Sequence, residues 1–304
     1  MKKLLKRIAI GFALLLVFGT TAFAVAVVAR ENRTFEAPYP DIHASGDPTV
    51  IARGEYLVRG PAHCVACHGE DLRGGLKFSL PVGTIYARNI TPDEATGIGR
   101  YSDREIARIL RFGVHPTGRA MLPFMPFANL ADDDLTAVVS YLRSRSAIHN
   151  RVPAHDFNVI GRVAKAFILE PKGPTVTPPK HVEPAVTAEY GEYIANTVAN
   201  CGGCHTKRDM RTGGAIGVAF AGGQTVESHR TPGVTFVTPN LTPDPATGHI
   251  TAWSEEMFVA RFKNAVDTAS PMPWGEFRTL SDGDLRALYR YLRSQPPAKL
   301  GQQL

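Results

Sequence analysis

The sequence predicts an all-α protein, in which an N-terminal transmembrane helix precedes two tandem copies of one small helical module. Three observations predict this architecture: an uncharged apolar run near the N-terminus, a set of short motifs that occurs twice, and apolar residues at helical spacing near the end of each copy. A length of 304 residues suits two domains of about 100–150 residues plus extensions. A hydrophobic content of 44% argues against wholesale disorder.

The first segment is a candidate membrane anchor. Residues 8–29 carry no charge, and four basic residues precede them: Lys2, Lys3, Lys6 and Arg7. About 20 apolar residues span a bilayer as a helix, whereas the apolar core of a signal peptide has roughly 7–15. The length favours an uncleaved anchor with a cytoplasmic N-terminus, because the basic cluster precedes the span. Cleavage stays open as the alternative, since residues 22–24 (Ala-Phe-Ala) have the form that signal peptidase cuts.

The net charge of +6 does not indicate nucleic-acid binding. Five of the basic residues flank the apolar run, namely Lys2, Lys3, Lys6, Arg7 and Arg30. The remaining 29 basic residues nearly balance 28 acidic residues and form no basic stripe. A nucleic-acid partner is therefore excluded.

The four cysteines form two Cys-x-x-Cys-His motifs, at residues 64–68 and 201–205. Two thiols one helical turn apart add to the two vinyl groups of one porphyrin, and the histidine that follows ligates the iron. A shared zinc site would use all four thiols, and a thioredoxin-like pair or a disulfide does not require histidine after both pairs. The motifs favour two haem c groups, held covalently through Cys64, Cys67, Cys201 and Cys204, with His68 and His205 as axial iron ligands.

Other motifs repeat in the same order. Gly54-Glu55-Tyr56-Leu57 and Gly191-Glu192-Tyr193-Ile194 each begin ten residues before a motif's first cysteine. Asn89-Ile90-Thr91-Pro92-Asp93 recurs as Asn240-Leu241-Thr242-Pro243-Asp244. Each copy therefore predicts a helix, the haem motif, a long loop, a helix, a methionine-containing loop and a last helix.

The last helices have the clearest periodicity. Apolar residues recur at i, i+3, i+4 and i+7, as Leu135, Val138, Val139 and Leu142 and as Leu285, Leu288, Tyr289 and Leu292. Ser281 with Asp284 predicts a capping box at the start of the second of these helices, and Ser102 with Glu105 predicts one for an earlier helix. Tyr56 and Tyr193 are expected to pack in the core.

The expected domain boundaries follow from these motifs and from a proline-rich stretch. We expect the anchor or signal sequence at residues 1–30, a linker at 31–46, the first domain at 47–150, a proline-rich connector at 151–186 and the second domain at 187–304.

Methionine is the expected sixth iron ligand. Met125-Pro126-Phe127 and Met272-Pro273-Trp274 share a Met-Pro-aromatic pattern shortly before the last helices, and proline stiffens a loop that must hold a thioether on iron. We therefore assign Met125 and Met272. Met121 and His115 remain alternatives in the first copy. Met210 lies too close to His205 to reach across the ring, and Met257 is expected to pack in the core.

With these motifs, residues 47–295 resemble the membrane-anchored bacterial di-haem cytochrome c family, whose members are electron-transfer subunits of periplasmic dehydrogenases. The resemblance implies two tandem class I-like cytochrome c domains with His/Met haems, anchored in the inner membrane and exposed to the periplasm. It also implies two partners, a periplasmic dehydrogenase and a respiratory acceptor such as an oxidase, a soluble cytochrome or quinone.

Electron transfer without catalysis is the expected function. A di-haem peroxidase is the first alternative, and it would need an open sixth position, against which the two Met-Pro loops argue. The di-haem subunit of a haem-copper oxidase is the second alternative, because such a chain is also anchored and has two modules.

Overall fold

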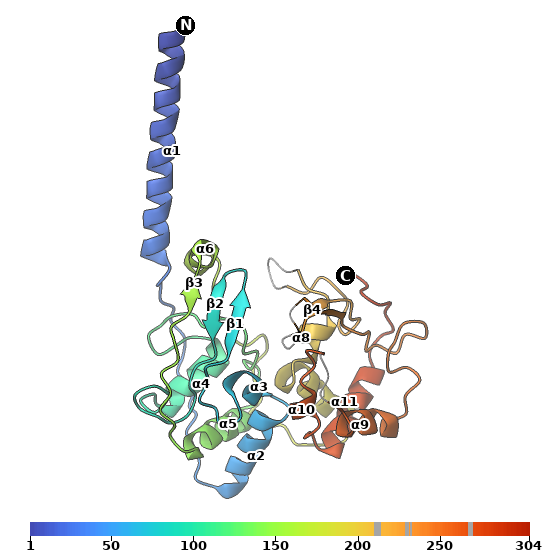
Figure 1. Ribbon diagram of the computed structural model, residues 1–304. Helices are drawn as coiled ribbons and strands as arrows, with labels where there is room; N and C mark the ends of the chain where they lie inside the picture. The colour runs from blue at the N-terminus through green and yellow to red at the C-terminus, as the bar shows by residue number, and fades with distance from the viewer. Residues whose placement is uncertain (210–213, 229–230, 232, 267–269) are drawn as a thin grey trace.

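Helix α1 (Lys2–Arg30) projects away from the rest of the chain in the computed structural model, which describes residues 1–209, 214–228, 231, 233–266 and 270–304 (Figure 1). Val27, near its C-terminal end, is its buried residue. Within the described parts of the chain, α1 is the one helix whose length and apolar composition, with a mean hydropathy of 2.4 over an 18-residue stretch, allow it to span a bilayer.

The first repeat follows the predicted order of elements. Its helices are α2 (Pro48–Arg59), α3 (Cys64–His68), α4 (Asp103–Phe112) and α5 (Asp132–Ser144). The predicted capping box at α4 is confirmed, since Ser102 and Glu105 each bond the backbone of the other. The four predicted apolar positions of α5 are buried in the core.

The second repeat has the same order with two additions. Its helices are α7 (Ala188–Tyr193), α8 (Cys201–His205), α9 (Glu255–Lys263), α10 (Trp274–Phe277) and α11 (Asp282–Arg293). A π-helical turn, η1 (Ile194–Val198), continues α7, and the short α10 follows directly after Met272 and Pro273. Apolar periodicity predicts neither addition, because both are about one turn long.

The all-α prediction misses five short strands. Strands β1 (Lys77–Leu80) and β2 (Gly83–Tyr86) pair antiparallel, and β3 (Asp156–Phe157) joins β2. Strands β4 (Thr225–Glu227) and β5 (Thr235–Val237) form a second antiparallel pair. With two to four residues each, these strands are too short to show alternating polarity in the sequence.

The proline-rich stretch between the repeats is partly folded. Besides β3 it contains helix α6 (Val159–Phe167), whose N-cap Asn158 accepts a hydrogen bond from the Gly161 amide. Gly161 allows α6 to approach the β1–β2 turn closely, because a Cβ there would lie 2.1 Å from the Val82 carbonyl oxygen. Much of this stretch therefore lies on the first repeat.

Two glycines of the repeated Gly-Glu-Tyr segments set the main helix crossings. A Cβ on Gly54 in α2 would lie 1.9 Å from the carbonyl oxygen of Ala137 in α5, and a Cβ on Gly191 in α7 would lie 2.0 Å from that of Ala287 in α11. The first and last helices of each repeat therefore touch backbone to backbone. Close approach, rather than backbone conformation, requires glycine at both positions.

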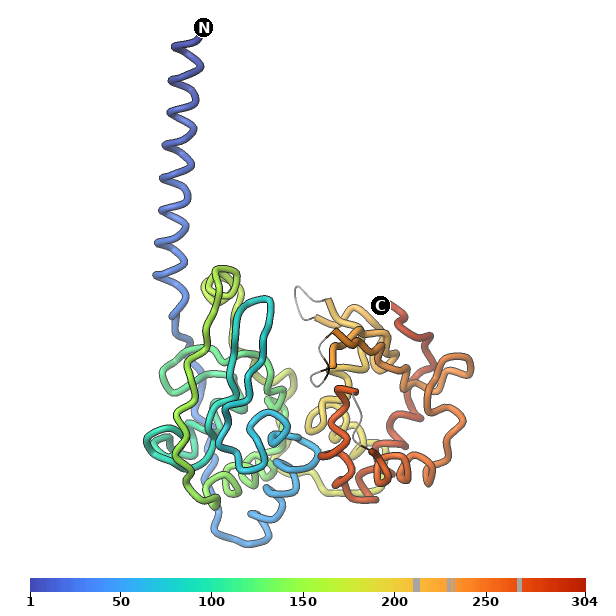
Figure 2. Tube along the Cα trace, in the orientation of Figure 1, coloured from blue at the N-terminus to red at the C-terminus, as the bar shows by residue number. Residues whose placement is uncertain are grey.

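The two repeats lie side by side, as the tube in Figure 2 shows. One hydrophobic cluster runs through both, and it includes Leu57 and Leu135 of the first repeat together with Ile194 and Leu285 of the second, all fully buried. Fully burying one leucine or isoleucine side chain contributes roughly 1.5–3 kcal/mol. The contact between the repeats is therefore part of the hydrophobic core.

Candidate haem-binding sites

Helices α3 and α8 position the two Cys-x-x-Cys-His motifs in the same way. The residue before each helix, His63 or Asn200, has a left-handed backbone, with φ of 38° and 49°. Histidine and asparagine are among the residues that tolerate this conformation. In each motif the first cysteine is half-buried and the second is exposed, and all four thiols are free. The sequence thus places two thiols one turn apart at the edge of each repeat.

The two histidines have the same orientation. The His68 ring presents Nδ1 to the Arg88 carbonyl oxygen at 2.7 Å, and the His205 ring presents Nδ1 to the Pro239 carbonyl oxygen at 3.0 Å. A carbonyl oxygen accepts a hydrogen bond and cannot donate one, so each Nδ1 carries the hydrogen and each Nε2 keeps a lone pair. Burial lowers the pKa of both rings, which favours this neutral form. Both imidazoles are therefore prepared to ligate a metal through Nε2.

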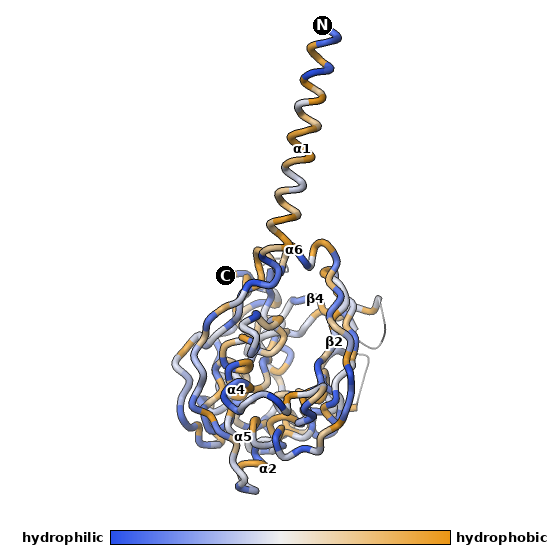
Figure 3. Tube along the Cα trace, turned by 90° about the vertical axis from the view of Figure 1, so that its left-hand side faces the viewer, coloured by the Kyte–Doolittle hydropathy of each residue, from blue (hydrophilic) through white to orange (hydrophobic). Residues whose placement is uncertain are grey.

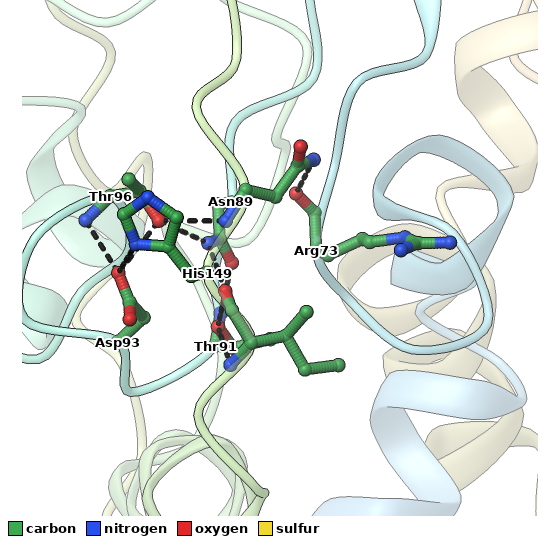
Figure 4. Close-up of polar contacts among 8 residues, drawn as sticks. Arg73, Asn89, Thr91, Asp93, Thr96 and His149 are labelled. Atoms are coloured by element: carbon green, nitrogen blue, oxygen red, sulfur yellow. Dashed lines mark hydrogen bonds and ion pairs between the residues drawn. The ribbon is translucent and has the colours of Figure 1, made fainter.

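A side-chain network holds the carbonyl that orients each histidine. In the first repeat, Asn89 follows Arg88, and its Nδ2 donates to the Thr96 hydroxyl at 3.0 Å and to the Ile148 carbonyl at 2.8 Å (Figure 4). The amide and hydroxyl of Thr91 both donate to Asn89 Oδ1, at 3.0 and 2.8 Å. Asn89 therefore joins the segment behind His68 to the chain that leaves α5.

The second repeat contains the same network. Asn240 follows Pro239, and its Nδ2 donates to the Thr247 hydroxyl at 2.9 Å and to the Ala298 carbonyl at 2.6 Å. Thr242 donates to Asn240 Oδ1 from its amide at 2.9 Å and from its hydroxyl at 2.8 Å. The repeated Asn-x-Thr-Pro-Asp segments therefore support His68 and His205, a role that sequence reasoning missed although the repetition itself is visible.

The thiols do not have the character of a redox pair. Burial raises the pKa of Cys64 and of Cys201 to about 12, and it also raises the pKa of Cys67 and Cys204. A thioredoxin-like pair needs a thiol whose pKa is lowered. The described residues also contain no group of three or more His, Cys, Asp or Glu side chains placed to hold a metal ion.

The structure separates the candidate methionines. Met125 and Met272 are half-buried and pack against the hydrophobic core, as do Cys64 and Cys201. The Met121 amide donates to the Gly113 carbonyl at 2.7 Å, in the turn that leaves α4. The prediction that Met257 packs in the core is wrong, because this side chain is 54% exposed on the outer face of α9. Met210 lies outside the described residues.

His115, the alternative to methionine in the first repeat, already has two partners. Its Nε2 lies 3.0 Å from the Tyr101 hydroxyl, and its Nδ1 lies 2.8 Å from the Thr117 hydroxyl. Both ring nitrogens are thus engaged with hydroxyl groups. This arrangement favours Met125 over His115 as the sixth ligand.

A cavity of about 460 Å³ lies where the two repeats meet. Val65 and Ala66 of α3 line one side, and Met272 and Trp274 of the second repeat line the other. Beside α3, the His63 ring meets the edge of the Phe277 ring with their centroids 5.5 Å apart. The first Cys-x-x-Cys-His helix therefore borders the methionine segment of the second repeat.

The residues present fit a haem c group in each repeat. Each repeat supplies two free thiols one turn apart, an imidazole with an available Nε2, and a half-buried thioether that packs against the core. These are the donors that a covalently attached haem with His/Met ligation requires. Because the donors are duplicated, the fit holds for both repeats.

Comparison with known proteins agrees with this donor set. Residues 51–146 match the family described as cytochrome c. The chain is 33% identical over 283 residues to an alcohol dehydrogenase (quinone) cytochrome c subunit of Gluconobacter oxydans, which covers 85% of this chain and 57% of that protein. It is 28% identical to a gluconate 2-dehydrogenase cytochrome c subunit of Pantoea cypripedii, over 92% of this chain and 64% of that protein.

A relative of similar length also matches. The chain is 25% identical to a protein described as diheme cytochrome c-type from Cereibacter sphaeroides, over 94% of this chain and 97% of that protein. The chain spans 57% and 64% of the length of the two dehydrogenase cytochrome subunits named above.

Proposed function

We propose that this chain, a cytochrome c-domain protein related to the cytochrome c subunits of bacterial dehydrogenases, carries electrons from a periplasmic dehydrogenase toward a respiratory acceptor. The observation that supports this function best is the duplicated donor set, in which His68 and His205 each present a free Nε2 beside two thiols. In this proposal the chain is an electron carrier and not itself an enzyme.

The proposed sites use four residues each. In the first, Cys64 and Cys67 would hold the haem covalently and His68 and Met125 would bind its iron. In the second, Cys201, Cys204, His205 and Met272 would take these roles. When bound there, haem c supplies reversible one-electron chemistry at its iron. Ligation by a histidine and a thioether would favour the reduced state of the iron and would suit electron transfer rather than substrate binding.

The chain's other residues set the conditions for transfer. Asn89 and Asn240 hold the segments whose carbonyl oxygens orient the two imidazoles. The hydrogen bond from Nδ1 to the carbonyl increases the basicity of Nε2, the nitrogen that would bind iron. The contact of His63 with Phe277 and the cavity beside it bring the first attachment helix against the second methionine segment. This proximity supports passage of electrons between the two sites within one chain.

Membrane attachment and location complete the proposal. The apolar helix α1 serves as an uncleaved anchor in the bacterial inner membrane with its N-terminus in the cytoplasm. The domains at residues 47–150 and 187–304 then lie in the periplasm, where the partner dehydrogenase works. Anchoring keeps the carrier at the membrane surface, where it meets its respiratory acceptor, which is an oxidase, a soluble cytochrome or quinone.

The spin state of the oxidised haems tests whether the protein is an electron carrier or an enzyme. Both haems are expected to be low-spin and to show the absorption band of methionine bound to ferric iron. In M125A and M272A this band should decrease by about half, because each change removes one thioether, whereas M121A, the matched control in the first repeat, should leave it intact. A high-spin haem in the wild-type chain would favour a di-haem peroxidase, and loss of the band in M121A would reassign the ligand.

A further inference from the structure

Helix α6 lies against the C-terminal end of α1, as two views of the molecule show (Figures 1 and 3). The Phe167 ring stacks on the Phe23 ring with centroids 6.0 Å apart and planes 15° apart. The Arg162 guanidinium donates to both carboxylate oxygens of Glu31, at 2.7 and 2.8 Å. An aromatic stack and a bidentate ion pair therefore tie α6 to the base of the proposed anchor.

The position of this contact along α1 gives its depth in the bilayer. Phe23 lies within the uncharged run, seven residues before Arg30, the first charged residue after it. At about 1.5 Å per residue, Phe23 lies roughly 10 Å further into the span than Arg30. The charged end of a transmembrane helix marks the boundary of the hydrocarbon core. A side chain at the level of Phe23 is therefore at a depth where lipid, and not bulk water, surrounds α1.

The surface of α6 is divided in the way that an interfacial helix requires. Gly161 and Ala166 are buried against the first repeat, while Val159, Ile160 and the following Ile168 are 78%, 65% and 69% exposed. Each of its two charged residues has a partner, because Arg162, whose side chain is 46% exposed, pairs with Glu31 and Lys165 lies 4.9 Å from the centre of the Phe157 ring. Three large apolar side chains near the base of the proposed anchor are thus mostly exposed.

We propose that α6 lies in the membrane–water interface and places Val159, Ile160 and Ile168 among the lipids, as a second membrane contact beside α1. The inference rests on the anchoring role proposed above for α1. Transfer of each of these side chains from water into lipid lowers the free energy, as their burial in a protein core would. Because α6 is also packed on the β1–β2 turn, this contact sets the orientation of the first repeat relative to the membrane, which a single helix followed by a linker does not.

Depth-dependent fluorescence quenching tests the proposal on the full-length protein with its haems attached. The four native thiols are then consumed as thioethers, so a thiol-reactive fluorophore labels only an introduced cysteine. Four variants are compared in vesicles of phosphatidylethanolamine and phosphatidylglycerol that contain brominated lipids: I160C and I168C in the α6 region, L16C within α1, and M257C on α9 as the exposed control.

Labels at positions 160 and 168 are expected to be quenched severalfold more than the label at 257 and less than the label at 16. Quenching at 160 and 168 as weak as at 257, with strong quenching at 16, would overturn this inference and leave the anchor in place. Weak quenching at 16 would show that the anchoring proposal itself fails, and the membrane contact of α6 with it.

A charge variant separates lipid contact from mere proximity. A label at V159C should lose at least half of its quenching when I160E and I168E are added, because a carboxylate resists transfer into lipid. Both substituted side chains are exposed, so the fold should be preserved, which circular dichroism and haem absorption check. Unchanged quenching would contradict the proposed burial of this surface.

Discussion

The Tyr56 hydroxyl donates a hydrogen bond to Asp284 Oδ2 at 2.6 Å, which joins two residues 228 positions apart in the sequence. The same hydroxyl accepts a hydrogen bond at 3.0 Å from the amide of Ser281, the N-cap of α11. Tyr56, from the first repeat, thus lies within the N-terminal turn of the last helix of the second repeat. Burial and the neighbouring Asp284 carboxylate raise the pKa of Tyr56, so it remains a donor at neutral pH.

The equivalent tyrosine of the second repeat makes the reciprocal contact with the first. The Tyr193 hydroxyl donates to Asp134 Oδ2 at 2.7 Å and accepts from the amide of Ala131, the N-cap of α5, at 3.0 Å. Each last helix is therefore capped by a tyrosine from the other repeat. Such a reciprocal exchange is the pattern of a two-fold interface between equivalent partners, here within one chain.

Removal of either hydroxyl should destabilise the protein. Y56F leaves the buried Asp284 Oδ2 and the Ser281 amide without this partner, and Y193F removes the partner of the Ala131 amide and one of two donors to Asp134 Oδ2, the other being Arg53 at 3.0 Å. We therefore expect each variant to lose about 1–3 kcal/mol in the free energy of unfolding, with the smaller loss in Y193F. Guanidinium denaturation followed by haem absorption measures it. Y39F is the matched control, because Tyr39 is 46% exposed and its hydroxyl can be solvated. If all three variants have the same stability as the wild type, the exchange does not hold the repeats together.

Asn89 should affect the haem of the first repeat alone. N89A removes the bonds to Thr96 and to the Ile148 carbonyl, so the Arg88 carbonyl is no longer held against His68. A weaker bond to Nδ1 makes the imidazole less basic, and we expect the reduction potential of one haem to rise while the other is unchanged. Potentiometric titration measures both.

N158A controls for stability in this experiment. Asn158 caps α6 through the Gly161 amide, away from both histidines, so its loss should cost about 1 kcal/mol and leave both potentials unchanged. N240A should repeat the effect of N89A on the other haem, since its network is equivalent. Equal shifts of both potentials in N89A would contradict this role of the asparagine.

His181 should make stability dependent on pH. Hydrogen bonds with Glu183 and Asp133 raise the pKa of this exposed imidazole above 6.5, because both carboxylates favour the charged ring. A group whose pKa is raised on folding stabilises the native state below its unfolded pKa and loses that effect as pH rises through the folded value. The difference in unfolding free energy between wild type and H181N should therefore be largest below pH 6.5 and vanish above the raised pKa. A difference that grows toward alkaline pH would contradict this prediction.

The sequence predicts the features that depend on spacing within one segment. The Ser102–Glu105 capping box forms as expected, and Leu135 and Leu285 lie in the core, since helical geometry alone decides both. At α11 the capping-box prediction holds in part. Ser281 Oγ accepts a hydrogen bond from the Asp284 amide, but the Ser281 amide donates to the Tyr56 hydroxyl, which in turn donates to the Asp284 carboxylate. Tyr56 was expected only to pack, and nothing local to it indicates a partner 228 residues away.

The supporting contacts of the candidate sites were less predictable for a related reason. The groups that orient His68 and His205 are backbone carbonyls, which leave no residue type to recognise. The available signal is that the Asn-x-Thr-Pro-Asp segment occurs twice. In each copy the asparagine, Asn89 or Asn240, directly follows the residue whose carbonyl oxygen contacts the histidine. The five short strands and the π-helical turn have no periodicity to detect, since each is at most five residues long.

Haem content tests the central claim most directly, namely that each repeat holds one covalently attached haem. The purified full-length protein is expected to carry two haems that acidified acetone does not extract, because both vinyl groups of each are bonded to cysteine. The C64A/C67A variant and its counterpart C201A/C204A should each keep one. One haem in the wild-type chain, or haem that the solvent removes, would contradict the account.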